Sequence, residues 1–120
     1  MSYKSLEIWR IAREIVIDIY HLTMKLPAYE MYETGSQIRR SSASIKSNIV
    51  EGYGRKRYKK EFIRFLVFAV ASRDETIDHL ETLKDKGLIK NQAAYDNIHS
   101  KLTEIGKMLN GFIQAVERND

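Results

Sequence analysis

Residues 48–64, NIVEGYGRKRYKKEFIR, connect two long helical patterns. The length of this connection determines how the second helix runs relative to the first. Gly52 and Gly54 lie where the first pattern stops. Glycine at such a place favours the end of a helix, and we expect one of the two to be a left-handed cap. Because the pattern resumes by residue 58, the link is short, and a short link predicts two antiparallel neighbours.

Apolar residues recur at helical spacing in four segments, about 5–24, 34–51, 58–86 and 91–117, the second beginning at residue 30 or 34. Strand-like alternation is absent, and the link at 87–91 is also short. The sequence therefore predicts an all-α fold, an antiparallel up-down-up-down four-helix bundle, with residues 1–120 as a single domain.

The ends of these segments carry their own signals. Ser5 and Asn91 are the expected N-caps of the first and last helices. Pro27 should stop the first helix, because the residue before a proline is driven out of the helical region. Gly87 is expected to close the third helix.

The third segment is apolar on two sides. One side supplies the core, and a second face over its first half consists of Ile63, Val67, Val70 and Ile77. A helix with two apolar faces has more surface to bury than one bundle core provides. This pattern predicts a subunit interface and hence a homo-oligomer.

Composition excludes several classes of protein. The chain has 120 residues, 43% of them hydrophobic and 30% charged, and it has no cysteine, which excludes a disulfide framework and thiolate chemistry. No apolar run approaches the roughly 18 residues of a membrane span. The first residues begin an amphipathic pattern without the apolar stretch of a signal peptide, so we expect a cytoplasmic protein without a membrane partner.

Charge is concentrated in one part of the chain. The net charge is +4, but residues 39–64 contain nine Lys or Arg against two Glu, and the remainder is acidic. Such a concentration indicates a polyanionic partner. The alternative is a solvated turn whose lysines only improve solubility.

The basic stretch does not have the spacing of a phosphate-binding loop, since GYGRKR lacks GxxxxGK[ST] and no strand precedes it. Its cations could instead meet phosphates while Tyr53 and Tyr58 stack on unpaired bases. Arg39 and Lys46 are expected on the outward side of the second helix. The predicted nucleic-acid-binding residues are Arg39, Lys46, Tyr53, Arg55, Lys56, Arg57, Tyr58, Lys59, Lys60 and Arg64.

A second, polar stripe runs along the second helix at helical spacing. With two residues of the third helix it forms a predicted polar seam of Gln37, Arg40, Ser44, Asn48, Glu51, Ser72 and Glu75. The favoured interpretation is a hydrogen-bond network that fixes helix register. The other interpretation is a pore or binding groove.

Catalytic signals are weak. The three histidines, His21, His79 and His99, lie on three different predicted helices, and the sequence lacks the paired ExxH motifs of di-metal bundles. There is no GxSxG motif. We therefore expect no metal, no cofactor and no enzymatic activity.

Residues across most of the chain resemble the four-helix-bundle family named for proteins encoded in intervening sequences of bacterial large-subunit ribosomal RNA genes. The matching positions are Leu26-Pro27, Glu30, Gln37 to Ser41, Ser44-Ile45, Asn48-Ile49, Glu51-Gly52, Gly54-Arg55, Phe62, Phe65-Leu66, Ala69, Ser72 and Glu75. The resemblance implies an antiparallel bundle assembled as a ring-like pentamer. A related group, the accessory proteins of diversity-generating retroelements, binds nucleic acid and a reverse transcriptase. The resemblance implies no catalytic residue.

The leading functional prediction is a non-enzymatic homo-oligomer, a pentamer, that binds nucleic acid, and RNA in particular, through the basic stretch. A reverse transcriptase is a further partner that the resemblance implies. The alternative is an assembly scaffold that binds another protein and has no nucleic-acid role. A third hypothesis is an enzyme or ligand-binding bundle that uses the polar seam.

Overall fold

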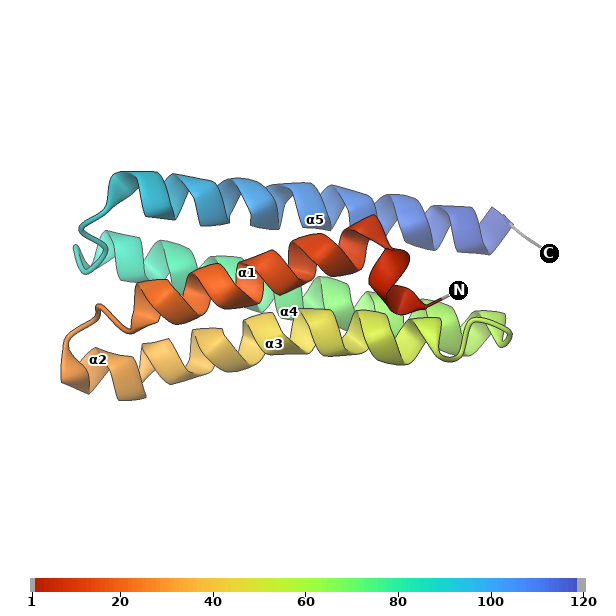
Figure 1. The fold of residues 1–120 in the computed structure, drawn as a ribbon, viewed down its shortest axis with the longest axis horizontal. Coiled ribbons are helices and arrows are strands. Elements are labelled where there is room, and N and C mark those ends of the chain that lie inside the picture. Colours follow the sequence, from red (N-terminus) through yellow and green to blue (C-terminus); the bar gives the residue numbers. More distant parts are fainter. Residues whose placement is uncertain (1, 119–120) are drawn as a thin grey trace.

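A computed structural model describes residues 2–118, which form helices joined by short connections, with no strand among them. A 3₁₀ turn precedes five α-helices, which are α1 (Glu7–Thr23), α2 (Ala28–Tyr32), α3 (Thr34–Tyr53), α4 (Lys59–Asp85) and α5 (Gln92–Arg118) (Figure 1). Over this part of the chain, no helix combines the length and hydrophobicity needed to cross a bilayer.

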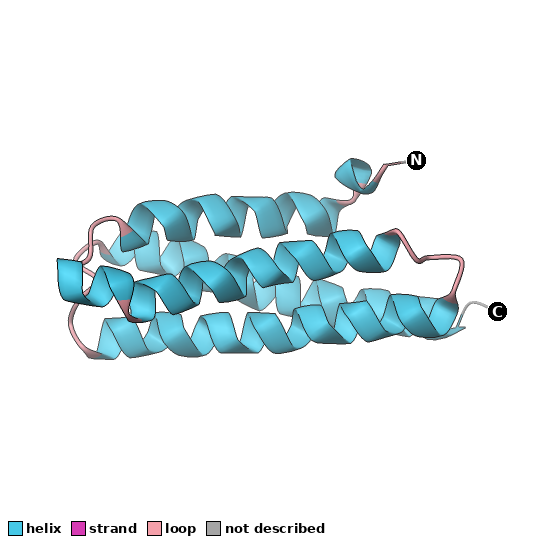
Figure 2. Cartoon of the chain, turned by 90° about the horizontal axis from the view of Figure 1, so that it is seen from below, coloured by secondary structure: helices cyan, strands magenta, loops and turns pink. Residues whose placement is uncertain are grey.

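The four long helices form a bundle with extents of 49 × 22 × 21 Å (Figure 2). Successive long helices run in opposite directions, as their short connections require. Both α1 and α4 pack against α3 and α5, which places α1 diagonally across the bundle from α4. The predicted all-α, up-down-up-down four-helix bundle is confirmed.

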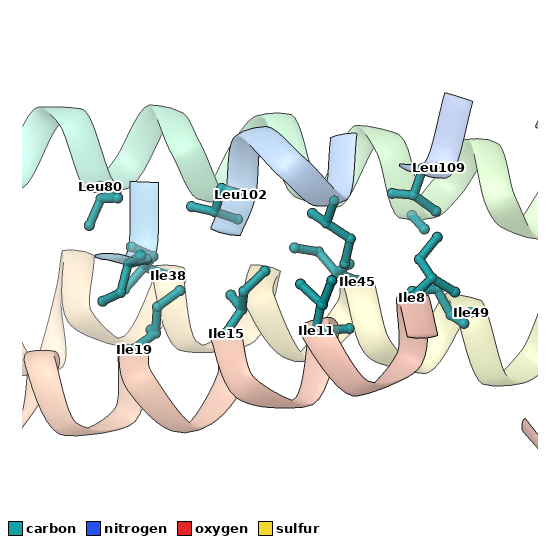
Figure 3. Packing of buried hydrophobic residues seen from close by; sticks show 14 of the residues in the cluster. Ile8, Ile11, Ile15, Ile19, Ile38, Ile45, Ile49, Leu80, Leu102 and Leu109 are labelled. Atoms are coloured by element: carbon teal, nitrogen blue, oxygen red, sulfur yellow. The ribbon is translucent and has the colours of Figure 1, made fainter. Parts of the chain in front are cut away.

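The core is a column of isoleucine and leucine side chains along the bundle axis (Figure 3). Ile15, Ile45, Leu80 and Leu102, one from each long helix, are completely shielded from solvent. Burying a side chain of this size contributes about 1.5–3 kcal/mol. The interior is mostly aliphatic, although the side chains of Thr23, Ser42 and Thr76 are also shielded from solvent.

Predicted helix ends are partly confirmed. Asn91 caps α5, because its Oδ1 accepts a hydrogen bond of 3.0 Å from the amide of Ala94. Gly87 follows α4 with a φ of +73°, the left-handed conformation that closes a helix. The prediction for Ser5 is wrong: it lies in the 3₁₀ turn, and Leu6 precedes α1 without a side-chain cap.

The prediction of a left-handed glycine at the end of α3 is also wrong. The helix continues through Gly52, and Gly54 ends it in right-handed geometry with a φ of −63°. Gly52 is needed for a different reason, which is the close approach of α4. A Cβ atom at this position would lie only 3.1 Å from Cβ of Phe65.

The second helical segment is interrupted near its start. Glu33, with φ −92° and ψ −100°, separates the short helix α2 from α3. Glu30 of α2 is buried, and its carboxylate accepts a hydrogen bond of 3.2 Å from Nζ of Lys86 in the connection between α4 and α5. This ion pair ties α2 to the opposite half of the bundle.

We predict that the ion pair between Glu30 and Lys86 makes the stability of the fold depend on pH. The hydrogen bonds that Glu30 receives from Lys86 and Thr34 lower the pKa of its carboxyl group below the usual value. A lowered folded-state pKa means that the stabilisation is complete above the unfolded-state pKa of about 4.3 and is lost as the pH falls through the folded value.

Glu30→Gln should accordingly reduce the free energy of unfolding at pH 7, and the difference from wild type should shrink as the pH falls from 5 to 3. Urea unfolding over this pH range measures the effect. Glu33→Gln, which removes an exposed carboxylate three residues away, is the control. A difference that stays constant with pH would contradict the assignment.

Candidate nucleic-acid interface

The basic stretch forms a tight turn between α3 and α4. Successive backbone hydrogen bonds fold it, from the amide of Arg55 to the carbonyl of Gly52 at 2.9 Å and from the amide of Tyr58 to the carbonyl of Arg55 at 2.8 Å. Because the backbone groups bond to one another, the side chains of the turn are directed outward. Tyr58 is 61% exposed, and Lys56 and Arg57 are exposed as well.

Arg55 holds the turn in place. Its Nη1 lies 2.6 Å from Oε2 of Glu51, one helical turn earlier, and its guanidinium group lies over the ring of Phe65 at 4.6 Å. Glu51 neutralises its charge, and Phe65 covers one face. Although the sequence places Arg55 in the nucleic-acid surface, its contacts are those of a group that joins the turn to both helices.

Tyr53 is less available for stacking than its sequence position suggests. It is half-buried and meets Phe62 edge to face, with ring centroids 6.4 Å apart. The ammonium group of Lys56 covers its ring at 4.2 Å and lies 3.1 Å from its hydroxyl oxygen. A base would have to displace Lys56 to stack on Tyr53, whereas Tyr58 is open to solvent.

Two further predicted cations have partners on the protein. Lys59 is half-buried and donates a hydrogen bond of 2.8 Å from Nζ to the carbonyl of Glu117, near the end of α5, where the helix dipole favours a cation. Arg64 lies 3.6 Å from Glu61 and over the ring of Phe68 at 5.4 Å. Both cations lie near the turn, but each already contacts other groups of the protein.

Four residues form what we call the exposed tract, namely Lys56, Arg57, Tyr58 and Lys60. Within residues 2–118, no carboxylate forms an ion pair with any of its three cations. Helix α4 begins at the tract without a side-chain cap, so its first amide groups add positive potential. The tract is therefore the part of the basic stretch that is open to a polyanion.

Arg39 does not belong to this surface. The expectation that it points outward is wrong, because it is partly buried and its Nη2 donates a hydrogen bond of 3.0 Å to the carbonyl of Met31. It lies sixteen positions before Arg55 on the first turns of α3, at about 1.5 Å per residue. The break before α3 brings Met31 within its reach. Lys46, farther along α3, is half-buried rather than outward.

The predicted polar seam lies between α3 and α4, and its middle is a hydrogen-bonded pair. The Oγ atoms of Ser44 and Ser72 are 2.8 Å apart, and the side-chain Nδ2 of Asn48 donates to the carbonyl of Ser44 at 2.9 Å. Two residues that the seam prediction omitted lie deeper: Thr76 donates from Oγ1 to Oγ of Ser41 at 2.8 Å. The sequence gives a reason to include Ser41, since it lies among four serines in 41–47. It gives none for Thr76, which lies within an apolar stripe.

The ends of the seam differ from its middle. Gln37, Arg40 and Glu75 are exposed and line a polar hollow of about 280 Å³ together with Ser41, Ser44 and Ser72. Glu51 lies apart from the hollow and binds Arg55. The seam therefore combines a short hydrogen-bond network in its middle with an open groove. Each of the two interpretations from the sequence, network and groove, describes one part of it.

Two of the three histidines, His79 and His99, each pair with a single carboxylate. Nε2 of His79 lies 3.3 Å from Glu75 on the same helix, and Nε2 of His99 lies 2.9 Å from Glu81 on the neighbouring helix. In the described part of the chain, no three acidic or histidine side chains come together as a metal site requires.

Comparison with known proteins identifies a matching protein family and a similar solved structure. Residues 4–111 match the sequence profile of a family described as 23S rRNA-intervening sequence protein. Among solved structures, the chain is similar to a protein of unknown function from the S23 ribosomal protein family of Bacteroides thetaiotaomicron, with a TM-score of 0.80 and 29% sequence identity over 88% of this chain and 97% of that one. No curated protein matches the chain.

Proposed function

Because the chain belongs to the family of 23S rRNA-intervening sequence proteins, we propose that it is a non-enzymatic helical bundle that binds nucleic acid, and RNA in particular, through the exposed tract. The observation that carries this proposal is that Lys56, Arg57 and Lys60 have no carboxylate partner within residues 2–118 and neighbour the exposed side chain of Tyr58 in the chain. Phosphates would meet Lys56, Arg57 and Lys60, and an unpaired base would stack on Tyr58.

A salt series tests this proposal. A 20-nucleotide single-stranded RNA, its duplex and a DNA of the same sequence are titrated with the protein by gel shift between 50 and 300 mM KCl. Three phosphate contacts to a single strand predict a slope of about −2 in log K against log salt for each protomer that binds, because each contact contributes about 0.7. Absence of binding, or binding indifferent to salt, would refute the proposal.

We also propose that the protein is a homo-oligomer, a pentamer, which would repeat the tract around one assembly and strengthen weak contacts through avidity. Support comes from α4, where Val67 and Phe68 are 49% and 41% exposed on the side away from the core. Exposed apolar neighbours of this size are typical of a surface that another protein covers.

A variant with Val67→Glu and Phe68→Glu should therefore lose self-association and keep its fold. Multi-angle light scattering should give wild-type protein a mass near five times 14.0 kDa, and the variant a mass near 14.0 kDa with unchanged circular dichroism. Lys107→Glu with Asn110→Glu, both on the exposed side of α5, is the control and should keep the wild-type mass. A monomeric wild-type protein would contradict the oligomer.

The alternative function, an assembly scaffold for another protein, draws on the same apolar pair on α4. The two functions differ in which surface is needed. An assembly scaffold without a nucleic-acid role requires Val67 and Phe68 but is indifferent to the charge of the exposed tract.

A further inference from the structure

A second hollow lies at the end of the bundle opposite the exposed tract. It has a volume of about 220 Å³ and is bordered by the last turns of α1, the connection between α4 and α5, and the first turns of α5. Its apolar lining consists of Leu22, Leu26, Leu88, Ile89, Ala94 and Ile98. The hollow is therefore distinct from the polar groove between α3 and α4 and from the basic turn.

The local fold keeps this hollow open. The left-handed Gly87 turns the chain at the end of α4, and the amide of Leu88 bonds back to the carbonyl of Leu83 at 3.1 Å. Leu88 and Ile89 then follow without helical structure and form one wall, since α5 begins only at Gln92. The facing wall comes from α1.

The rim of the hollow has an excess of positive charge. The one carboxylate among its lining residues, Asp18, is already engaged, because Nζ of Lys101 lies 2.7 Å from Oδ2 and the side-chain Nδ2 of Asn97 donates to the same atom at 3.1 Å. Within the described part of the chain, Nζ of Lys90 donates to the carbonyl of Gly87, at 3.0 Å, and to no carboxylate. The side chain of Lys25 has no hydrogen bond or ion pair with any residue in 2–118, and only its backbone amide is bonded, to the carbonyl of Leu22. Two ammonium groups thus border an apolar hollow, and neither is paired with a carboxylate from residues 2–118.

Size limits the ligand further. An apolar cavity of about 150 Å³ is large enough to hold benzene. The present hollow, at about 220 Å³, has room for one ring or a short branched chain and a small polar head. Apolar walls do not suit a sugar or a chain of phosphates, since those groups would lose their hydration without hydrogen-bonding partners.

The geometry points to a binding site for a small amphipathic carboxylate, an aryl-alkanoic or short branched-chain acid. Its hydrocarbon part lies against Leu22, Leu88 and Ile98, and its carboxylate lies at the rim beside Lys25 and Lys90. This site is independent of RNA binding, so the two proposals stand or fall separately.

The test uses three probes of one shape on ¹⁵N-labelled full-length protein. These are 3-phenylpropionate, the neutral 3-phenylpropan-1-ol and the cationic 3-phenylpropylamine. The acid should shift the amide signals of Leu88, Ile89 and Ala94 with a Kd of about 0.1–1 mM, in keeping with the affinity that a ligand of this size can reach. The alcohol should bind about tenfold more weakly, and the amine should cause no saturable shift.

Two variants separate the roles of charge and space. Lys25→Gln with Lys90→Gln should weaken binding of the acid about tenfold and leave binding of the alcohol unchanged. Ala94→Phe should fill the hollow and abolish binding of both, whereas Ala93→Phe, at the exposed neighbouring position, should bind like wild type. The double lysine variant alters only exposed side chains, so it remains informative if Ala94→Phe does not fold.

Three results would overturn the inference. The first is no saturable shift at these amides up to 10 mM acid. The second is equal affinity for acid and alcohol, which would remove the role of the lysines. The third is a set of shifts that follows protein concentration rather than probe concentration, which would mean that another protein chain covers the hollow.

Discussion

Reversing the three cations of the exposed tract, by Lys56→Glu, Arg57→Glu and Lys60→Glu together, is expected to lower the affinity for single-stranded RNA by about 100-fold or more at 0.1 M salt. Each reversal replaces an attraction to phosphate with a repulsion. The salt dependence should also flatten by about two units of slope, because three contacts of about 0.7 each are lost. Gel shift and filter binding measure both quantities.

A control triple with the same change in net charge distinguishes a local surface from general attraction. Lys25→Glu, Lys90→Glu and Lys107→Glu alter exposed cations away from the turn. This variant should bind RNA within about threefold of wild type if the contacts are local, since charges beyond the Debye length of about 10 Å are screened. Equal losses in the two triples would mean that only the overall charge matters. Normal RNA binding by the tract triple would mean that RNA contacts another surface, and would refute the role of the exposed tract.

Gly52→Ala is expected to destabilise the bundle by about 1–3 kcal/mol, the usual cost of adding a methyl group to a close-packed contact. The new Cβ would lie 3.1 Å from Cβ of Phe65 and 3.4 Å from the carbonyl oxygen of Phe62. Neither atom is at the end of a flexible side chain, so α4 itself must move. Thermal unfolding should show a midpoint about 5–15 °C lower.

Gly54→Ala is the matched control two residues away. Its Cβ would meet only carbonyl oxygens at 3.6 Å, which is an ordinary contact, and the backbone there is right-handed. Because alanine restricts the unfolded chain more than glycine does, this variant should be neutral or more stable by up to about 1 kcal/mol. If both variants lose stability equally, the close approach of α4 is not the reason for Gly52.

The fold could be predicted because its determinants are local in the sequence. The spacing of Ile98, Leu102, Ile105 and Leu109 specifies one buried face of α5, and all four side chains are buried. Short connections then leave few ways to arrange the helices. The position of the basic turn could be predicted for the same reason, since charges that are adjacent in the sequence of one turn are also adjacent in space.

Partners of individual side chains were harder to predict. The spacing of Glu51 and Arg55 is that of a helical ion pair, but glycines between them hid the continuation of the helix. Arg39 could not be placed without the break before α3, which decides that it meets the carbonyl of Met31. Gly106 gives space to Arg73, whose Nε donates to the carbonyl of Leu102 at 2.9 Å, a contact that the spacing along α5 does not indicate.

The rings beside the basic turn have a consequence for the entropy of binding. Fixing a free lysine or arginine side chain costs up to about 2 kcal/mol of rotamer freedom. Lys56 already rests on the ring of Tyr53, at 4.2 Å, whereas the guanidinium group of Arg57 lies 6.0 Å from the centroid of the Tyr58 ring and leaves that side chain exposed. Part of this ordering has therefore taken place before a phosphate arrives. Such a preorganised surface loses less conformational entropy on association, and Lys60, which has no ring contact within residues 2–118, remains the adaptable contact.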